Sequence, residues 1–185
     1  MTVASRDRAK TSVEEAAKRI EHCREFVHLL PEVGTNLVAS QDRAKTLDEV
    51  VGLTGRIVKV EDRAVAVGAV KFGASKYMGN VLLTAMRYNP DFRAAINIKF
   101  SPEIIAICRE LGMEAQTHQW AVKPKEVTES KCAIPFTIEE LRRASEVVYD
   151  LGDIGIEASI IVFGRTATEV ADKAIKIAMR YVKKG

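Results

Sequence analysis

A glycine, a serine and a lysine lie close together at Gly73-Ala74-Ser75-Lys76, between an apolar run and the expected start of a helix. The N–H groups of a first helical turn attract anions, and the serine hydroxyl and lysine ammonium would add a donor and a charge. The segment is therefore a candidate phosphate-binding loop, although it is shorter than a Walker A motif. A turn glycine followed by an ordinary N-cap serine would produce the same residues, so both interpretations stay open.

Three carboxylates, Asp150, Asp153 and Glu157, are spaced through two glycines in one short segment. Glycines let a loop turn its carboxylates toward one point, where one or two oxygens can bind Mg²⁺ or accept hydrogen bonds from a ligand. Asp150 and Asp153 are the candidate metal ligands. The alternative is a solvated turn in which Asp and Gly take their usual turn positions.

Four further polar residues lie near the starts of expected strands. Arg56 would match phosphate oxygens with its planar guanidinium if the fold brings it to the Gly73 loop. Glu32 and Asn36 lie in a turn that leads into a strand, and Asn97 alternates with apolar neighbours. Each of the four also fits a plain turn, a surface charge or a solvent-facing position.

The histidines and cysteines of the chain show no metal-ligand or nucleophile spacing. They are His22, His28, His118, Cys23, Cys108 and Cys132. The odd number of cysteines, their wide spacing and the lack of a CxxC pair indicate reduced structural thiols, and hence a cytoplasmic protein. No Ser-His-Asp or Cys-His arrangement is indicated.

Helices and strands that do not alternate strictly must position these residues. Helical spacing predicts helices over residues 12–30, 46–51, 75–88, 101–112, 137–146 and 168–183. Apolar and β-branched runs predict strands over residues 36–39, 56–60, 64–67, 95–100, 113–118, 147–149 and 159–163. The spacing within 56–67 is that of a hairpin, which requires an antiparallel pair. We therefore expect an α/β fold with helices layered on a sheet, and no GxGxxG motif supports a Rossmann fold.

The whole chain has a globular composition, with 47% hydrophobic and 29% charged residues over a length of 185. This length can bury one good core, so we expect a single domain over residues 12–185, beginning with a capping box at Ser12 and Glu15. Residues 1–11 are polar and lack periodicity, which predicts a flexible lead-in or a linker remnant.

The charge pattern and the apolar runs argue against two classes of partner. The 28 basic and 25 acidic residues are interspersed, so we expect no nucleic-acid binding by this domain itself. No apolar run approaches the roughly 18 residues that a membrane helix needs, so we expect no membrane partner. Small phosphorylated molecules are the expected ligands, and a homodimer stays open.

Five ordered blocks of the sequence resemble the ThiN-type thiamine-phosphate synthases. The blocks are Pro31–Asn36, Gly55–Val58, Lys71–Ser75, Ala95–Lys99 and Asp150–Glu157, within a similarity that runs from about Val13 to Tyr181. The resemblance implies a three-layer α/β/α sandwich with a mixed, mostly antiparallel sheet, similar to class II aldolases. It also implies that such a domain often lies at the C-terminal end of a phosphomethylpyrimidine kinase, in a covalent fusion.

By this resemblance the chain would join hydroxymethylpyrimidine diphosphate to thiazole phosphate, giving thiamine monophosphate and pyrophosphate. The departing pyrophosphate gains negative charge, which Arg56, Lys76, the helix N-terminus at Ser75 and a Mg²⁺ ion would stabilise. Carboxylates would favour the pyrimidine-methyl cation that is left behind. Positioning would supply much of the remaining acceleration, because no enzyme nucleophile is required.

The resemblance implies roles for particular residues. Arg56 and Tyr77 would be catalytic, and Mg²⁺ would accompany the diphosphate substrate. Binding of substrate or phosphate would fall to Glu32, Asn36, Gly73, Ala74, Ser75, Lys76, Asn80, Asn97, Asp150, Asp153 and Glu157.

The sequence departs from the family pattern in the helix after Gly73. Synthases typically carry His and, three residues later, Arg there, whereas this chain has Tyr77 and Asn80. Tyr77 is a poor proton carrier at neutral pH, and Asn80 lacks the charge that would hold phosphate. Two alternatives therefore stay open: a non-catalytic thiamine-phosphate sensor, or a structural domain without a ligand.

Overall fold

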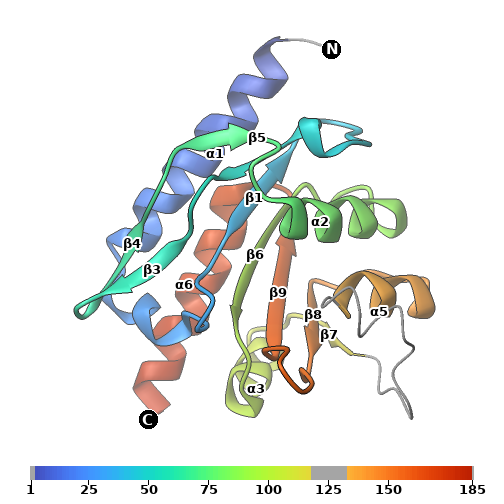
Figure 1. Ribbon diagram of the computed structural model, residues 1–185. Helices are drawn as coiled ribbons and strands as arrows, with labels where there is room; N and C mark the ends of the chain where they lie inside the picture. The colour runs from blue at the N-terminus through green and yellow to red at the C-terminus, as the bar shows by residue number, and fades with distance from the viewer. Residues whose placement is uncertain (1–2, 118–132, 185) are drawn as a thin grey trace.

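A computed structural model describes residues 3–117 and 133–184 of the chain (Figure 1). In these residues seven strands form one sheet in the order β5-β2-β1-β6-β9-β8-β7. The strands are β1 (Leu37–Ser40), β2 (Val50–Leu53), β5 (Val70–Phe72), β6 (Ala94–Lys99), β7 (Ala115–Gln116), β8 (Val147–Asp150) and β9 (Ser159–Gly164). Neighbouring strands are antiparallel except β7 and β8, which are parallel. The predicted mixed, mostly antiparallel sheet is confirmed.

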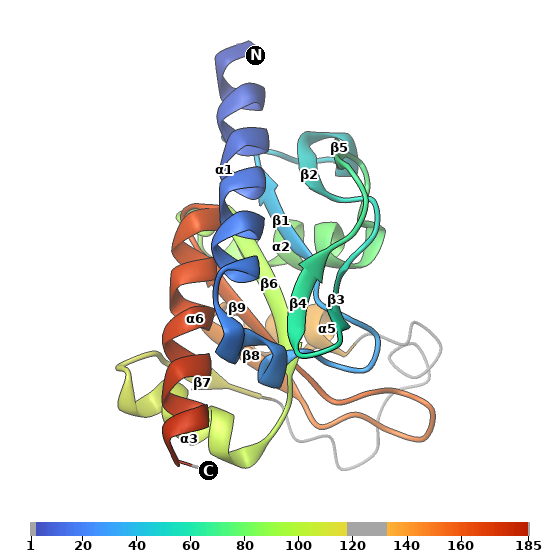
Figure 2. The same ribbon diagram turned by 90° about the vertical axis from the view of Figure 1, so that its left-hand side faces the viewer.

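Helices cover both faces of the sheet (Figures 1 and 2). The back face carries α1 (Val3–Glu21), the 3₁₀ helix η1 (Arg24–Leu29), α3 (Pro102–Glu110) and α6 (Ala167–Lys184). The front face carries α2 (Lys76–Tyr88) and α5 (Ile134–Leu141). Each face buries its own apolar cluster, with Ile177 of α6 at the back and Leu82 of α2 at the front, both fully buried. The expected three-layer α/β/α sandwich is therefore present.

The hairpin of β3 (Ile57–Val60) and β4 (Arg63–Ala66) forms a separate two-stranded sheet beside α1, as its spacing predicted. An isolated bridge between Thr35 and Ile57 joins this hairpin to the turn that precedes β1. The hairpin therefore fixes the position of the residue before it, Arg56.

The N-terminal helix differs from its prediction at both ends. It begins at Val3, so a flexible lead-in is wrong for residues 3–11, and Ser12 lies inside the helix instead of capping it. Tertiary contacts explain the extension: Ala9 belongs to the buried core, and the Arg6 guanidinium lies 4.0 Å from the centre of the Phe72 ring. The helix ends at Glu21, and the rest of the predicted helix 12–30 is the separate η1.

Two further elements were predicted incorrectly. The segment 46–51 is only a 3₁₀ turn, η2 (Leu47–Glu49), because Val50 and Val51 pair with β1 and begin β2. Helix α5 begins before Thr137, which is buried inside it, and ends where Arg142 adopts a left-handed backbone with φ of 50°. Its predicted start and end were therefore both displaced toward the C-terminus.

The remaining predicted elements occur within a few residues of their expected positions. The predictions for His118 and Cys132 lie outside the described residues. Among the residues that are described, no helix is long and apolar enough to span a membrane.

Candidate functional site

One edge of the front face is polar because of strand alternation. Val38, Ala95 and Val148 point into the front core, on β1, β6 and β8. Side chains two positions apart share a face, so Asn36, Asn97 and Asp150 lie on this same face, where the apolar core ends. The sheet therefore brings together three of the predicted site residues from distant parts of the sequence.

The two asparagines bind backbone groups. Asn97 Oδ1 accepts a hydrogen bond from Asn36 N at 2.6 Å, and Asn97 Nδ2 donates to Gly34 O at 3.1 Å. Asn36 Nδ2 donates to Leu53 O and Gly55 O, at 3.3 and 3.2 Å. Both residues are only 4% exposed. Their amides hold the turn at Gly34 and the segment before Arg56, so the structure gives them a positioning role.

Arg56 lies against the turn that these amides hold. Gly34 has φ of +78°, and a Cβ at this position would lie 3.1 Å from Arg56 Cδ and 3.1 Å from Ile57 O. Glycine is required both by the left-handed backbone and by the passing arginine stem. Arg56 itself is exposed, immediately before β3.

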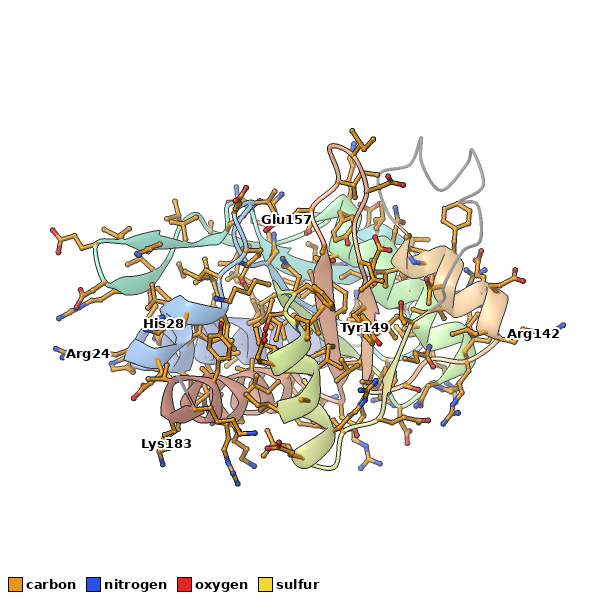
Figure 3. All side chains as sticks on the ribbon, turned by 90° about the horizontal axis from the view of Figure 1, so that it is seen from below. Arg24, His28, Arg142, Tyr149, Glu157 and Lys183 are labelled. Atoms are coloured by element: carbon orange, nitrogen blue, oxygen red, sulfur yellow. The ribbon has the colours of Figure 1, made fainter. Side chains whose placement is uncertain are left out.

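Glu157 connects two loops that are far apart in sequence. Its carboxylate accepts hydrogen bonds from Glu32 N at 2.8 Å and from Val33 N at 3.2 Å. Figure 3 shows Glu157 between the turn after η1 and the loop that joins β8 to β9. Glu32 and Glu157, both candidate binding residues, thus lie together, and the Glu157 carboxylate binds the backbone of the turn.

The loop that carries Glu157 is a tight β-hairpin turn. Asp153 and Ile156 exchange backbone hydrogen bonds of 3.0 and 2.9 Å, and Asp153 Oδ1 accepts the N–H of Ile154 at 2.8 Å. Asp153 therefore has the ordinary turn role that the sequence left open. Asp150 differs, because it is only 6% exposed at the end of β8, on the polar edge.

The Gly73 segment forms the entry to α2. Gly73 has φ of +71° and donates its N–H to Val50 O at 2.9 Å. Ser75 is the N-cap residue, but its side chain makes no capping hydrogen bond, and no acidic residue lies in the first turn of α2. This helix end lies in front of β1 (Figure 1). The Asp48 carboxylate lies nearby, because its Oδ1 would be 3.3 Å from a Cβ at Gly73, and it offsets part of the positive end of the helix dipole.

Lys71 is a cation that the sequence analysis did not select as a site residue. Phe72 packs toward the back cluster, so the preceding residue on β5 points to the front. Lys71 pairs in register with Gly52 of β2, which presents no side chain there. Alternation relative to Phe72 was the available signal, but it required knowing that 70–72 is a strand.

A family model described as thiamine-phosphate synthase ThiN matches residues 12–176. The thiamine-phosphate synthase ThiN of Methanothermobacter thermautotrophicus is 34% identical over 175 residues, covering 92% of each chain. The chain belongs to the ThiN family. The resemblance seen in the five sequence blocks is confirmed.

Other members of the family are parts of longer proteins. The bifunctional thiamine biosynthesis protein ThiDN of Methanocaldococcus jannaschii is 32% identical over 154 residues, which are 83% of this chain and 37% of that protein. A crystal structure of the C-terminal domain of a phosphomethylpyrimidine kinase superimposes with a TM-score of 0.77 at 35% identity, covering 95% of this chain and 98% of that one. ThiN domains therefore occur both alone and fused to a kinase.

The two residues that depart from the ThiN pattern have different surroundings. Tyr77 is 37% exposed in the first turn of α2, beside Lys76. Asn80, one turn later, lines a cavity of about 830 Å³ together with Arg43 and Arg93. None of residues 73–77 lines that cavity, so the structure does not group Asn80 with the Gly73 loop.

The ThiN-family chain offers no ready-made metal cage in its described part, where no three His, Cys, Asp or Glu side chains lie close enough to hold an ion. Mg²⁺ is commonly held by one or two carboxylates together with substrate phosphates. The donor set fits that arrangement, with Asp150, buried at the end of β8, and Asp153, in the turn that follows, as the two carboxylates.

Proposed function

We propose that this chain is a thiamine-phosphate synthase domain. It joins hydroxymethylpyrimidine diphosphate to thiazole phosphate and releases pyrophosphate, forming thiamine monophosphate. The observation that carries the proposal is the front face of the sheet, which carries the start of α2 with no acidic residue in its own first turn, the cation Lys71 and the buried Asp150. Family membership supplies the reaction, and this face supplies groups that suit it.

The anionic end of the pyrimidine substrate belongs at the start of α2. The first-turn N–H groups, the Ser75 hydroxyl and Lys76 would bind the diphosphate, with Lys71 on the adjacent strand. As the bond between the methylene carbon and the diphosphate oxygen breaks, negative charge grows on the leaving group. Arg56 would stabilise that charge with its guanidinium fork. Mg²⁺, carried in on the diphosphate, would neutralise part of the same charge.

The pyrimidine-methyl fragment belongs next to Asp150. Loss of pyrophosphate leaves this fragment cationic, and a buried carboxylate stabilises a nearby cation strongly because little water screens it. The thiazole nitrogen then forms the new carbon–nitrogen bond with its lone pair. No protein nucleophile takes part, so the chain contributes binding, charge and alignment.

Tyr77 would act in this scheme as a hydrogen-bond donor to a phosphoryl oxygen. The phenol keeps its proton at neutral pH, and donation needs no proton transfer. A reaction whose leaving group needs charge stabilisation more than a proton therefore tolerates tyrosine where other synthases carry histidine.

The proposal is tested by pyrophosphate release from purified protein with both substrates and Mg²⁺. We expect release that depends on both substrates, and a fall of about 100-fold or more in Arg56→Ala, the size expected for losing one transition-state donor. Lys59→Ala on the exposed hairpin is the matched control and should keep full activity. Folded protein that binds thiamine monophosphate without releasing pyrophosphate would identify a sensor instead.

A further inference from the structure

A second cationic site lies along the outer side of α2. The cavity of about 830 Å³ is lined by four cations from three segments: Arg43 and Lys45 after β1, Arg87 in α2, and Arg93 before β6. No Asp or Glu lines it among the described residues. Leu83 and Met86 of α2 supply apolar wall between the charges.

Two of the four cations form no salt bridge with a described residue. Arg87 pairs with Glu139, and Arg93 pairs with Asp42. Arg43 and Lys45 form no ion pair with any residue in the described part of the chain. A ligand in the cavity would therefore meet the charge of Arg43 and that part of the Lys45 charge which the Glu49 carboxylate leaves uncompensated. The paired arginines still offer free N–H groups.

The loop that presents these cations is rigidly held. Glu49 Oε2 accepts the backbone N–H groups of Lys45 at 2.7 Å and Thr46 at 3.1 Å. These hydrogen bonds lower the pKa of the Glu49 carboxyl, so it stays ionised and keeps holding the loop. Arg43 has φ of 58°, a left-handed conformation that arginine seldom adopts and that clusters at binding sites. The cationic side chains thus project from a preorganised frame.

We propose that this cavity binds a nucleotide, with the phosphates on Arg43 and Lys45 and the base against Leu83 and Met86. The cavity is much larger than inorganic phosphate, and its apolar wall suits a ring. A nucleotide combines a neutral ring with at least two negative charges, which suits a wall that carries four cationic side chains and no described carboxylate. Thiamine phosphates match less well, because four cations repel their positively charged thiazolium ring. The site goes beyond the synthase reaction.

The experiment is isothermal titration of ADP into protein that carries Arg56→Ala and Ser75→Ala, which remove the proposed synthase phosphate contacts. We expect one site for ADP. Adding Arg43→Gly and Lys45→Ala should weaken binding at least tenfold, and glycine preserves the left-handed turn at position 43. Adding Lys59→Ala and Arg63→Ala on the hairpin removes the same charge elsewhere and should leave the affinity unchanged.

Competing ligands and the control separate the outcomes. Inorganic phosphate and thiamine monophosphate should each bind at least tenfold more weakly than ADP. The proposal is overturned if ADP at millimolar concentration gives no heat of binding, if inorganic phosphate binds equally well, or if thiamine monophosphate binds more tightly. It is also overturned if the cavity pair and the hairpin pair of added substitutions weaken ADP binding equally. Circular dichroism confirms that each variant is folded. Because no synthase substrate is present, failure here leaves the pyrophosphate assay unaffected.

Discussion

The buried side chains on the two faces of the sheet differ in kind: those at the back are apolar, whereas the front edge also buries two hydrogen-bonding amides. At the back, α1 and α6 bury apolar side chains such as Ile177, which contribute to the free energy of unfolding through packing. At the front edge, Asn36 and Asn97 are equally buried, but their amides hold the turn that carries Gly34 and lies beside Arg56. The back should therefore determine stability, whereas the front should determine activity through geometry.

The largest expected effect is on stability, from Ile177→Ala in the back core. Truncating a fully buried isoleucine should lower the free energy of unfolding by about 2–5 kcal/mol, through lost burial and the cavity left behind. Urea unfolding measures the loss. The comparison predicts that pyrophosphate release per folded molecule stays within about twofold, and a parallel loss of activity would contradict it.

Arg56→Ala should show the opposite behaviour. Its side chain is exposed, so the midpoint of urea unfolding should hardly move, whereas the rate of pyrophosphate release should fall by the equivalent of about 3–4 kcal/mol. Steady-state kinetics with both substrates distinguishes the two effects. A stability loss as large as that of the core variant would place Arg56 among the structural residues.

Asn97→Ala should affect both properties, because Asn97 is buried at the front edge. Removing its amide leaves Asn36 N and Gly34 O without their partners, at a cost of about 1–3 kcal/mol. Activity should also fall as the turn beside Arg56 loosens. Thermal unfolding and the pyrophosphate assay on one preparation test this, and a variant that loses activity at full stability would show direct substrate contact.

Cys108 of the back core allows a pH test of burial. Desolvation raises the pKa of its thiol from 9.0 to about 12, so unfolding favours the thiolate above pH 9. Stability from this group is complete below pH 9 and decreases as the pH rises toward 12, by about 1 kcal/mol at pH 10. Urea unfolding at pH 8 and pH 10 measures this fall in the free energy of unfolding. Cys108→Ala should lose less stability between the two pH values than the unchanged protein. Parallel slopes would mean the thiol is accessible.

The smallest effect is expected from Glu157→Gln. The N–H groups of Glu32 and Val33 bind different oxygens of Glu157, so glutamine keeps an acceptor for one of them and loses both the second acceptor and the charge. Because this turn is exposed, the loss should be about 1 kcal/mol. We expect a modest rise in KM with kcat nearly unchanged, and Glu157→Ala should have the larger effect. A severe fall in kcat with glutamine would assign Glu157 to the reacting substrate.

The local pattern of apolar residues predicted most helices and strands, but it did not predict β2 or the start of α1. Hairpin 56–67, α2 and α6 follow from periodicity that tertiary contacts reinforce. By contrast, β2 was taken for the end of a helix because Val50 and Val51 fit either element, and only pairing with β1 decides between them. The start of α1 was missed for a similar reason, since residues 3–11 are mostly polar and their tertiary contacts, such as buried Ala9 and Arg6 over the Phe72 ring, are not visible in the local pattern.

The candidate site divides in the same way. By itself, the sequence determined the family, the α/β class, the hairpin and the chemical types of the site residues, because blocks such as Lys71–Ser75 are local. The tertiary structure alone decided that Asn36, Asn97 and Glu157 bind backbone, that Lys71 points to the front, and that Asn80 lines a different cavity. These outcomes depend on strand register and on contacts between residues up to 125 positions apart, which no local pattern encodes.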